Sequence, residues 1–236
     1  MTPSIIYSAV PEGSTKVRHF LEAGPVWDLV QEPGELRYAG WSLRTLDRVR
    51  IVRGEYLEVS NGDRKVLNLY EDGTFIAKAA ADDSFLGWGT RGETEFAESP
   101  RLNPLAVIEF TYSFVELYAR LLPEMDPRPR AVQLRLQIEN AWFGESGSSK
   151  LYLTPYGVDT YSWHFNDERH VAPDADMIRE VDVSADALAD VGAVAYRLVE
   201  KLYAWFGFSS DKIPYAARRG DTRVIDPTAF SKKGGQ

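Results

Sequence analysis

The chain has 236 residues, a formal net charge of −8, no cysteine and only three histidines, so few of the side chains that usually mark an enzyme site are present. Without a thiolate it cannot form a disulfide, a cysteine-bound zinc site or a cysteine-bound iron–sulfur cluster. Hydrophobic residues make up 44% of the sequence, which predicts a globular fold with a sizeable core.

No stretch approaches the roughly 20 apolar residues that a membrane-spanning helix needs. Residues 1–4 also lack the basic start of a signal peptide. We therefore expect a cytoplasmic protein with no membrane partner.

The first predicted element is a short helix that begins at Ser14, because Val17, Phe20 and Leu21 follow with helical spacing. A further turn of helix is expected over residues 26–30.

Three strands are predicted next, over residues 48–60, 64–70 and 74–80. The sequences Asn61-Gly62-Asp63 and Glu71-Asp72-Gly73 separate them, and both are typical of hairpin turns. This region therefore predicts a three-stranded antiparallel meander.

The clearest helix is predicted over residues 104–122, with Asn103 as its cap, Pro104 in its first position and Pro123 as its stop. Its apolar residues cover nearly the whole circumference, so it should be mostly buried. One polar stripe, with the last two residues at the solvent edge, consists of Glu109, Ser113, Glu116 and Arg120.

Residues 131–140 alternate apolar and polar side chains, which predicts a strand with one solvated face. Weaker strand signals cover residues 150–154, 160–165 and 177–183. A second long helix is predicted from a Ser184 cap to Phe206, and Gly207 would close it in the left-handed conformation.

Strands in runs between helices, without regular βαβ alternation, predict the α+β class with a mainly antiparallel sheet. We expect one domain over residues 1–215, with a sub-boundary at 123–130 as the alternative. From Lys212 to the end, six cations against Asp221 and Asp226 give +4, which leaves −12 for residues 1–211. Residues 216–236 are therefore predicted to be a basic, flexible tail.

Partner-binding residues are predicted at two places. Trp88 stands between glycines, which favours an exposed loop tip, and Arg91 follows it. The basic tail supplies Arg218, Arg219 and Arg223, which could contact a polyanion.

A metal site is the weaker hypothesis. His164, Asp167 and His170 lie within seven residues, and imidazole and carboxylate ligands suit zinc, iron or manganese. Their spacing matches no known metal motif, and an exposed turn before Pro173 is the favoured explanation of these residues. The sequence also lacks a nucleophile elbow, a P-loop and a dinucleotide-binding fingerprint.

Three stretches carry a family resemblance: residues 61–74 (NGDRKVLNLYEDGT), 103–110 (NPLAVIEF) and 202–208 (LYAWFGF), the last followed by Ile213-Pro214-Tyr215. Together they resemble the region that follows the AlbA-type, Schlafen-like DNA-binding domain in some bacterial proteins, over roughly residues 48–215. The resemblance implies a companion module in bacterial regulation or phage defence, with no catalytic residues to carry over.

These observations favour a non-catalytic binding or regulatory module that acts through a protein partner or a nucleic-acid complex, without a cofactor. Two alternatives stay open: a metal-dependent hydrolase or nuclease that uses residues 164–170, and a small-ligand sensor. Homodimerisation is a further option.

Overall fold

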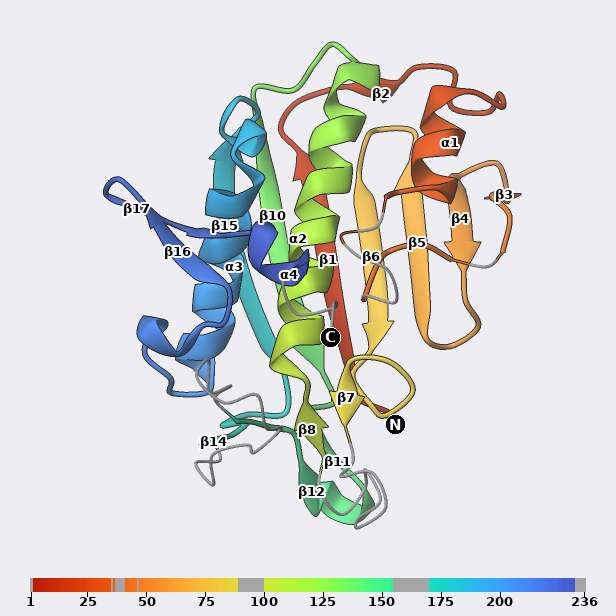
Figure 1. The fold of residues 1–236 in the computed structure, drawn as a ribbon. Helices are drawn as coiled ribbons and strands as arrows, with labels where there is room; N and C mark the ends of the chain where they lie inside the picture. The colour runs from red at the N-terminus through yellow and green to blue at the C-terminus, as the bar shows by residue number, and fades with distance from the viewer. Residues whose placement is uncertain are drawn as a thin grey trace.

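A computed structural model describes residues 2–34, 36, 41–45, 47–88, 100–154 and 170–231 of the chain. Its main feature is a seven-stranded sheet in which all neighbouring strands are antiparallel. Figure 1 shows the long helices on one face of this sheet. The predicted α+β class with a mainly antiparallel sheet is confirmed. From edge to edge, the strands are β15 (Met177–Ser184), β10 (Ala131–Glu139), β1 (Ser4–Pro11), β6 (Phe75–Ala80), β5 (Lys65–Tyr70), β4 (Tyr56–Ser60) and β3 (Arg50–Val52).

Strand β1 lies inside the sheet, between β10 and β6, although it comes first in the chain. Ile5, Tyr7 and Ala9 are fully buried, whereas Ile6 is half-buried and Val10 is 41% exposed. This is the period-2 pattern of a strand with one face on the core. No element was predicted here, because the apolar Ile6 and Val10 on the outer face hide the alternation in the sequence.

The helix predicted over residues 104–122 is confirmed as α2 (Pro104–Leu121). Asn103 caps it, since its Oδ1 accepts hydrogen bonds from the backbone N–H groups of Leu105 and Ala106 at 3.0 and 3.3 Å. Fifteen of its 18 residues are buried. The expectation of a mostly buried helix therefore holds.

The polar stripe of α2 is more buried than its composition suggests. Glu109 and Ser113 are buried, Glu116 is half-buried and Arg120 is exposed. The backbone N–H of Trp41 donates to Glu109 Oε2 over 3.3 Å, so a segment that precedes β3 covers this part of the helix. The solvent edge therefore lies only at the C-terminal end of the stripe.

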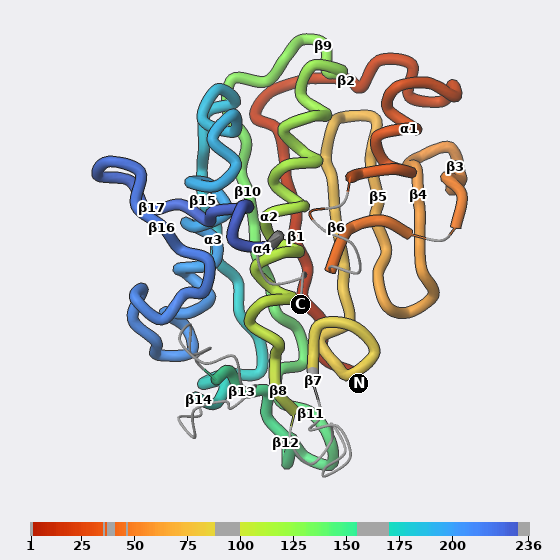
Figure 2. The backbone as a smooth tube through the Cα atoms, in the orientation of Figure 1, coloured from red at the N-terminus to blue at the C-terminus, as the bar shows by residue number. Residues whose placement is uncertain are grey.

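Helices α1 (Pro25–Gln31) and α3 (Val191–Trp205) lie on the same face of the sheet as α2, as Figure 2 also shows. Helix α1 confirms the turn predicted over residues 26–30. The predicted start of the last long helix at Ser184 is wrong, since Ser184 ends β15 and its Oγ accepts the N–H of Ala187 in the turn that leads into a 3-10 helix, Ala187–Ala189. Asp190 caps α3, and its Oδ1 accepts the N–H of Ala193 over 3.2 Å. Ser184 and Asp190 are both of residue types that cap helices. Asp190 starts the helix because it directly precedes the continuous apolar stripe.

The helix predicted from Ser14 is also wrong. Strand β2 (Lys16–Val17) occupies this segment and pairs with β9 (Met125–Asp126). The backbone N–H of Val17 also donates to the carbonyl of Glu71 over 2.8 Å. These long-range backbone hydrogen bonds favour a strand more strongly than the helical spacing of three apolar side chains favours a helix.

The strand predicted over residues 48–60 is interrupted. Arg53 and Gly54 have positive φ angles of 53° and 74° and turn the chain between β3 and β4. The meander from β3 to β6 therefore has four antiparallel strands instead of three.

A second, four-stranded sheet lies at the lower end of the molecule in Figure 1. Its order is β14 (His170–Val171), β13 (Tyr152–Leu153), β8 (Arg101–Leu102) and β7 (Gly87–Trp88), and the hairpin β11 (Trp142–Phe143) and β12 (Ser149–Lys150) lies beside it. The strands predicted over 131–140 and 177–183 are confirmed as β10 and β15. The prediction over 150–154 divides between β12 and β13, and that over 160–165 lies outside the described residues.

Residues 216–231 form the hairpin β16 (Ala216–Arg219) and β17 (Thr222–Ile225), followed by α4 (Thr228–Ser231). Ile225 and Phe230 are fully buried in the same hydrophobic cluster as Tyr7. The prediction of a flexible tail from residue 216 is therefore wrong up to residue 231, and residues 232–236 lie outside the described part. Short 3-10 helices in the described ranges are η1 (Leu122–Glu124), η2 (Glu145–Gly147), η3 (Ala187–Ala189) and η4 (Ser210–Lys212). Within those ranges, no helix combines the length and apolar character that crossing a bilayer demands.

Candidate binding site

The C-terminal hairpin follows from a few local signals. Gly207, with φ of 80°, ends α3 in the left-handed conformation. The chain then passes through η4 to Ile213, which is buried. Gly220 and Asp221 form the two-residue loop between β16 and β17. Gly220 has φ of 61° and stands at the first loop position, where type II′ hairpin turns require glycine.

The hairpin packs directly on α3. A Cβ atom at Gly192 would lie 2.6 Å from the carbonyl oxygen of Ile225, so only glycine allows this close approach between β17 and the first turn of α3. Val224 and Ile225 are buried there. Arg219 Nη1 pairs with Asp190 Oδ2 over 3.1 Å, which ties the hairpin to the residue that caps α3.

Helix α4 packs against α2 and against the segment that precedes the hairpin. The Phe230 ring meets the rings of Tyr112 and Tyr215 edge-on, with centroid distances of 5.7 and 4.5 Å. Asp226 Oδ1 accepts the N–H and the hydroxyl of Thr228 at 2.9 and 2.7 Å, which fixes the start of α4. Tyr215 has φ of 60°, a strained value for a bulky residue, so the surrounding contacts hold it in place.

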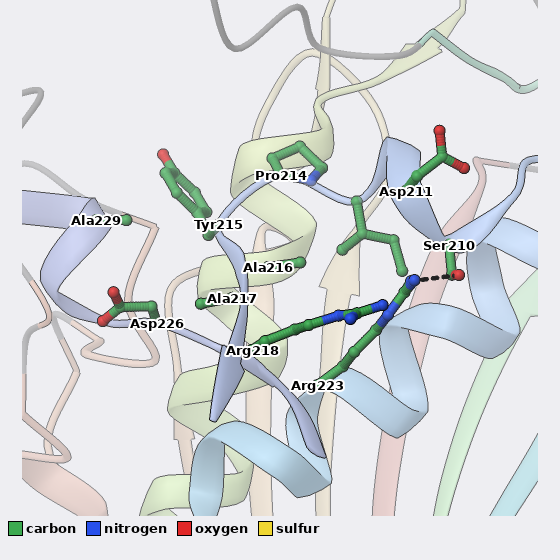
Figure 3. Close-up of a pocket in the computed structure, with 11 residues that line it drawn as sticks. Ser210, Asp211, Pro214, Tyr215, Ala216, Ala217, Arg218, Arg223, Asp226 and Ala229 are labelled. Atoms are coloured by element: carbon green, nitrogen blue, oxygen red, sulfur yellow. Dashed lines mark hydrogen bonds between the residues drawn. The ribbon is translucent and has the colours of Figure 1, made fainter. Parts of the chain in front are cut away.

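The hairpin, η4 and α4 enclose a pocket of about 410 Å³, which Figure 3 shows. This volume lies within the range of small-molecule sites in proteins. Much of its wall is apolar or has small side chains, and this part consists of Pro214, Tyr215, Ala216, Ala217 and Ala229.

Two arginines form the polar side of the pocket. Arg218 and Arg223 are directly opposite each other in the hairpin register. Arg223 Nη1 donates to Tyr196 Oη over 3.1 Å and to Ser210 Oγ, and the first of these bonds chiefly raises the pKa of Arg223. Tyr196 in turn donates to Glu200 Oε1 over 3.3 Å. The side chain of Arg218 is exposed and makes no hydrogen bond or ion pair with any residue in the described ranges.

Two carboxylates, Asp211 and Asp226, also line the pocket. The hydrogen bond from Ser209 is the main cause that lowers the pKa of Asp211, and nearby Arg223 lowers it further. Asp211 is therefore ionised at neutral pH. The pocket thus carries charges of both signs.

The predicted partner-binding residues that the structure describes do not lie together. Arg218 and Arg223 line the pocket, whereas Arg219 is held in its ion pair with Asp190. Trp88 belongs to β7 in the small sheet, where its backbone pairs with that of Arg101. Arg91 lies outside the described residues.

Of the three predicted metal ligands, only His170 is described, and His164 and Asp167 lie outside the described residues. His170 Nδ1 lies 2.8 Å from the carbonyl oxygen of Phe206, and its ring stacks on Phe208 with the centroids 3.9 Å apart. These contacts hold β14 to the end of α3. The part of the chain that the structure describes contains no group of three or more potential metal ligands.

Three members of this site were not predicted from the sequence: Tyr196, Ser210 and Tyr215. Their roles depend on the fold of the hairpin, and the available signal was the glycine followed by aspartate at 220–221 between two short runs. Because the arginines on either side dominate the composition, the segment resembled a basic tail.

The sheet face opposite the long helices is a less suitable site for an anion. Cations there are paired across strands with carboxylates, which neutralises the charge that a polyanion would need. The pairs are Lys78 with Glu139 at 3.4 Å, Arg135 with Glu180 at 2.7 Å, and Arg50 with Glu58.

Fold and pocket together define an α+β protein with a helical layer on one side of its sheet and a C-terminal hairpin pocket. Comparison with protein-family models, curated proteins and solved structures found no match. The resemblance to the Schlafen-like companion region therefore stays a hypothesis.

Proposed function

We propose that this chain is a non-catalytic binding module, and that the pocket side of its C-terminal hairpin recognises an anionic group of a partner protein or nucleic-acid complex. The observation that carries this proposal is the cross-strand pair Arg218 and Arg223, which lines a pocket of about 410 Å³.

The cross-strand position of the two arginines opposite each other does not itself stabilise the hairpin. Like charges directly opposite each other in an antiparallel pair destabilise it. Arg223 has Tyr196 and Ser210 as hydrogen-bond partners, but Arg218 has none among the described residues. An anion between the two guanidinium groups would relieve their repulsion and accept charge-assisted hydrogen bonds.

The described lining of the pocket favours binding over acid–base catalysis. It contains no histidine. A general base works best with a pKa near the working pH, whereas hydrogen bonding lowers the pKa of Asp211. The alternative of a metal-dependent hydrolase or nuclease at residues 164–170 gains no support from this pocket. The second candidate is the small-ligand sensor, which the volume of the pocket favours.

The proposal is tested by capture from native lysate with tagged wild-type chain, Arg218→Glu and the control Arg64→Glu. Arg64 is also exposed and makes no side-chain bond to a described residue, but it lies in the turn before β5. Wild type and Arg64→Glu should retain the same partners, and Arg218→Glu should lose them by about fivefold or more. Nuclease treatment then separates a protein partner from a nucleic-acid complex.

Arg218→Glu should not unfold the protein. Glutamate opposite Arg223 replaces a repulsive cross-strand pair by an attractive one, a change that typically stabilises by about 0.2–1 kcal/mol. A thermal unfolding midpoint at or above that of wild type is therefore expected. If Arg218→Glu captures every partner of the wild-type chain, the hairpin is not the contact surface.

A further inference from the structure

We infer that the pocket beside Arg218 and Arg223 binds the phosphate group of a small phosphate monoester. This inference rests on the proposed function, since both use Arg218, and it adds the chemical class of a ligand for the pocket.

The donors of the pocket suit a phosphate better than a carboxylate. Figure 3 shows the side chains of Arg218 and Arg223 close together, with Arg223 bonded to Ser210. One guanidinium group can occupy both oxygens of a carboxylate in a bidentate pair. A phosphate monoester presents three terminal oxygens, enough for two guanidinium groups and a hydroxyl at once.

The rest of the pocket indicates a ligand larger than a bare ion. A phosphate ion would leave most of the 410 Å³ unfilled. Ala216, Ala217 and Ala229 line this space and carry no polar side-chain atom, and the side chain of Pro214 is an apolar ring. Such a wall leaves room for the organic part of the ligand.

The two carboxylates limit the charge of the ligand. Asp211 and Asp226 line the same pocket, and carboxylates repel further negative charge nearby. This arrangement disfavours a triphosphate at the pocket. A single phosphate on an otherwise uncharged molecule keeps this repulsion smaller than a triphosphate does.

Isothermal titration calorimetry of the purified full chain tests the inference with inorganic phosphate, ribose 5-phosphate, AMP, ATP and unphosphorylated ribose. Ribose 5-phosphate or AMP should bind with a Kd of about 1 mM or lower, and ribose should not bind. ATP should bind more weakly than AMP because of the carboxylates. No saturable binding of either monoester, or tighter binding of ATP than of AMP, would overturn the inference.

Variants then show whether the arginine pair is responsible. Arg218→Ala should weaken monoester binding about tenfold. Arg218→Lys should weaken it by a similar factor, because an ammonium group keeps the charge but lacks the planar fork. Arg64→Ala should leave affinity unchanged. Equal affinity of Arg218→Ala and wild type would place the ligand elsewhere and overturn the assignment.

The two proposals fail separately. Loss of lysate partners in Arg218→Glu without monoester binding by the wild-type chain would overturn the ligand class and leave the binding module intact. Monoester binding that is lost in Arg218→Glu, together with unchanged lysate partners, would support the ligand class and overturn the partner-binding function.

Discussion

Replacing Gly192 by alanine should displace the C-terminal hairpin from α3. The new Cβ would lie 2.6 Å from the carbonyl oxygen of Ile225 and 3.4 Å from the Cβ of Val224. Real Cβ atoms essentially never approach closer than 3.0 Å, so β17 has to move by at least 0.4 Å, the difference between the two distances. Ile225 is also paired with Ala216, so the strand cannot shift without its neighbour.

The size of the effect follows from two opposing contributions. Alanine in place of glycine inside a helix favours the helix by about 1 kcal/mol. Overpacking a tight contact costs about 1–3 kcal/mol, and the upper part of this range, about 2–3 kcal/mol, applies here because the clashing atom belongs to the backbone and cannot rotate away. We therefore expect a net loss of about 1–2 kcal/mol, which lowers the unfolding midpoint of a protein this size by roughly 2–8 °C.

Thermal and urea unfolding measure this loss, and Gly24→Ser is the matched control. At Gly24 the nearest atom to a new Cβ lies 4.0 Å away, and φ of 173° is extended backbone that serine adopts readily. Serine is also a preferred helix cap, so the control should be neutral or slightly stabilising. If Gly192→Ala is as stable as wild type and keeps its monoester affinity, the close approach of β17 to α3 is not as described.

Four further substitutions test buried and capping groups. Tyr7→Phe removes a buried hydrogen bond of 2.8 Å to Thr111 and should cost about 1 kcal/mol of stability. Tyr203→Phe removes a buried hydroxyl that bonds to none of the described residues, and it should be neutral or stabilising. Equal losses of stability for the two variants in urea unfolding would contradict this difference. Asn103→Ala removes the cap of α2 and should cost about 0.5–2 kcal/mol, and a loss below that range would mean that the cap is dispensable. Burial raises the pKa of Glu116, so the folded protein binds this proton more tightly than the unfolded chain does. Stability should therefore fall as pH rises from the ordinary glutamate pKa through the higher folded value. Glu116→Gln should raise the unfolding midpoint at pH 7 and lose this advantage below the ordinary glutamate pKa; an advantage that persists in acid would have another cause.

Elements with strong local signals were predictable from the sequence. Asn103 followed by proline gave the start of α2, and an apolar circumference gave its burial, because both depend on residues within a few turns. The same holds for β10, because its regular alternation of apolar and polar residues shows which side chains face the core and which face solvent.

Elements that depend on distant partners were not predictable in this way. In β1 the apolar residues Ile6 and Val10 on the outer face hide the alternation of apolar and polar side chains. Its position in the sheet depends on pairing with β6 and β10. The burial of Phe230 requires Tyr112 from α2 and Tyr215 from the segment before the hairpin. The candidate site was foreseen only in part for the same reason. Arg218 and Arg223 were visible as charges, but their pairing required the hairpin.

The position of β1 also shapes the order in which the chain can fold. Ser4 pairs with Glu139, 135 residues along the chain, whereas the meander from β3 to β6 joins strands that are close in sequence. Local pairings form fast, and long loops close slowly because of their entropy. Until β1 inserts, β10 and β6 each expose an unpaired strand edge. Unpaired edges can form backbone hydrogen bonds with another chain and so promote aggregation. A partly folded state with this gap would be prone to aggregation for as long as β1, a strand of eight residues, stays unpaired.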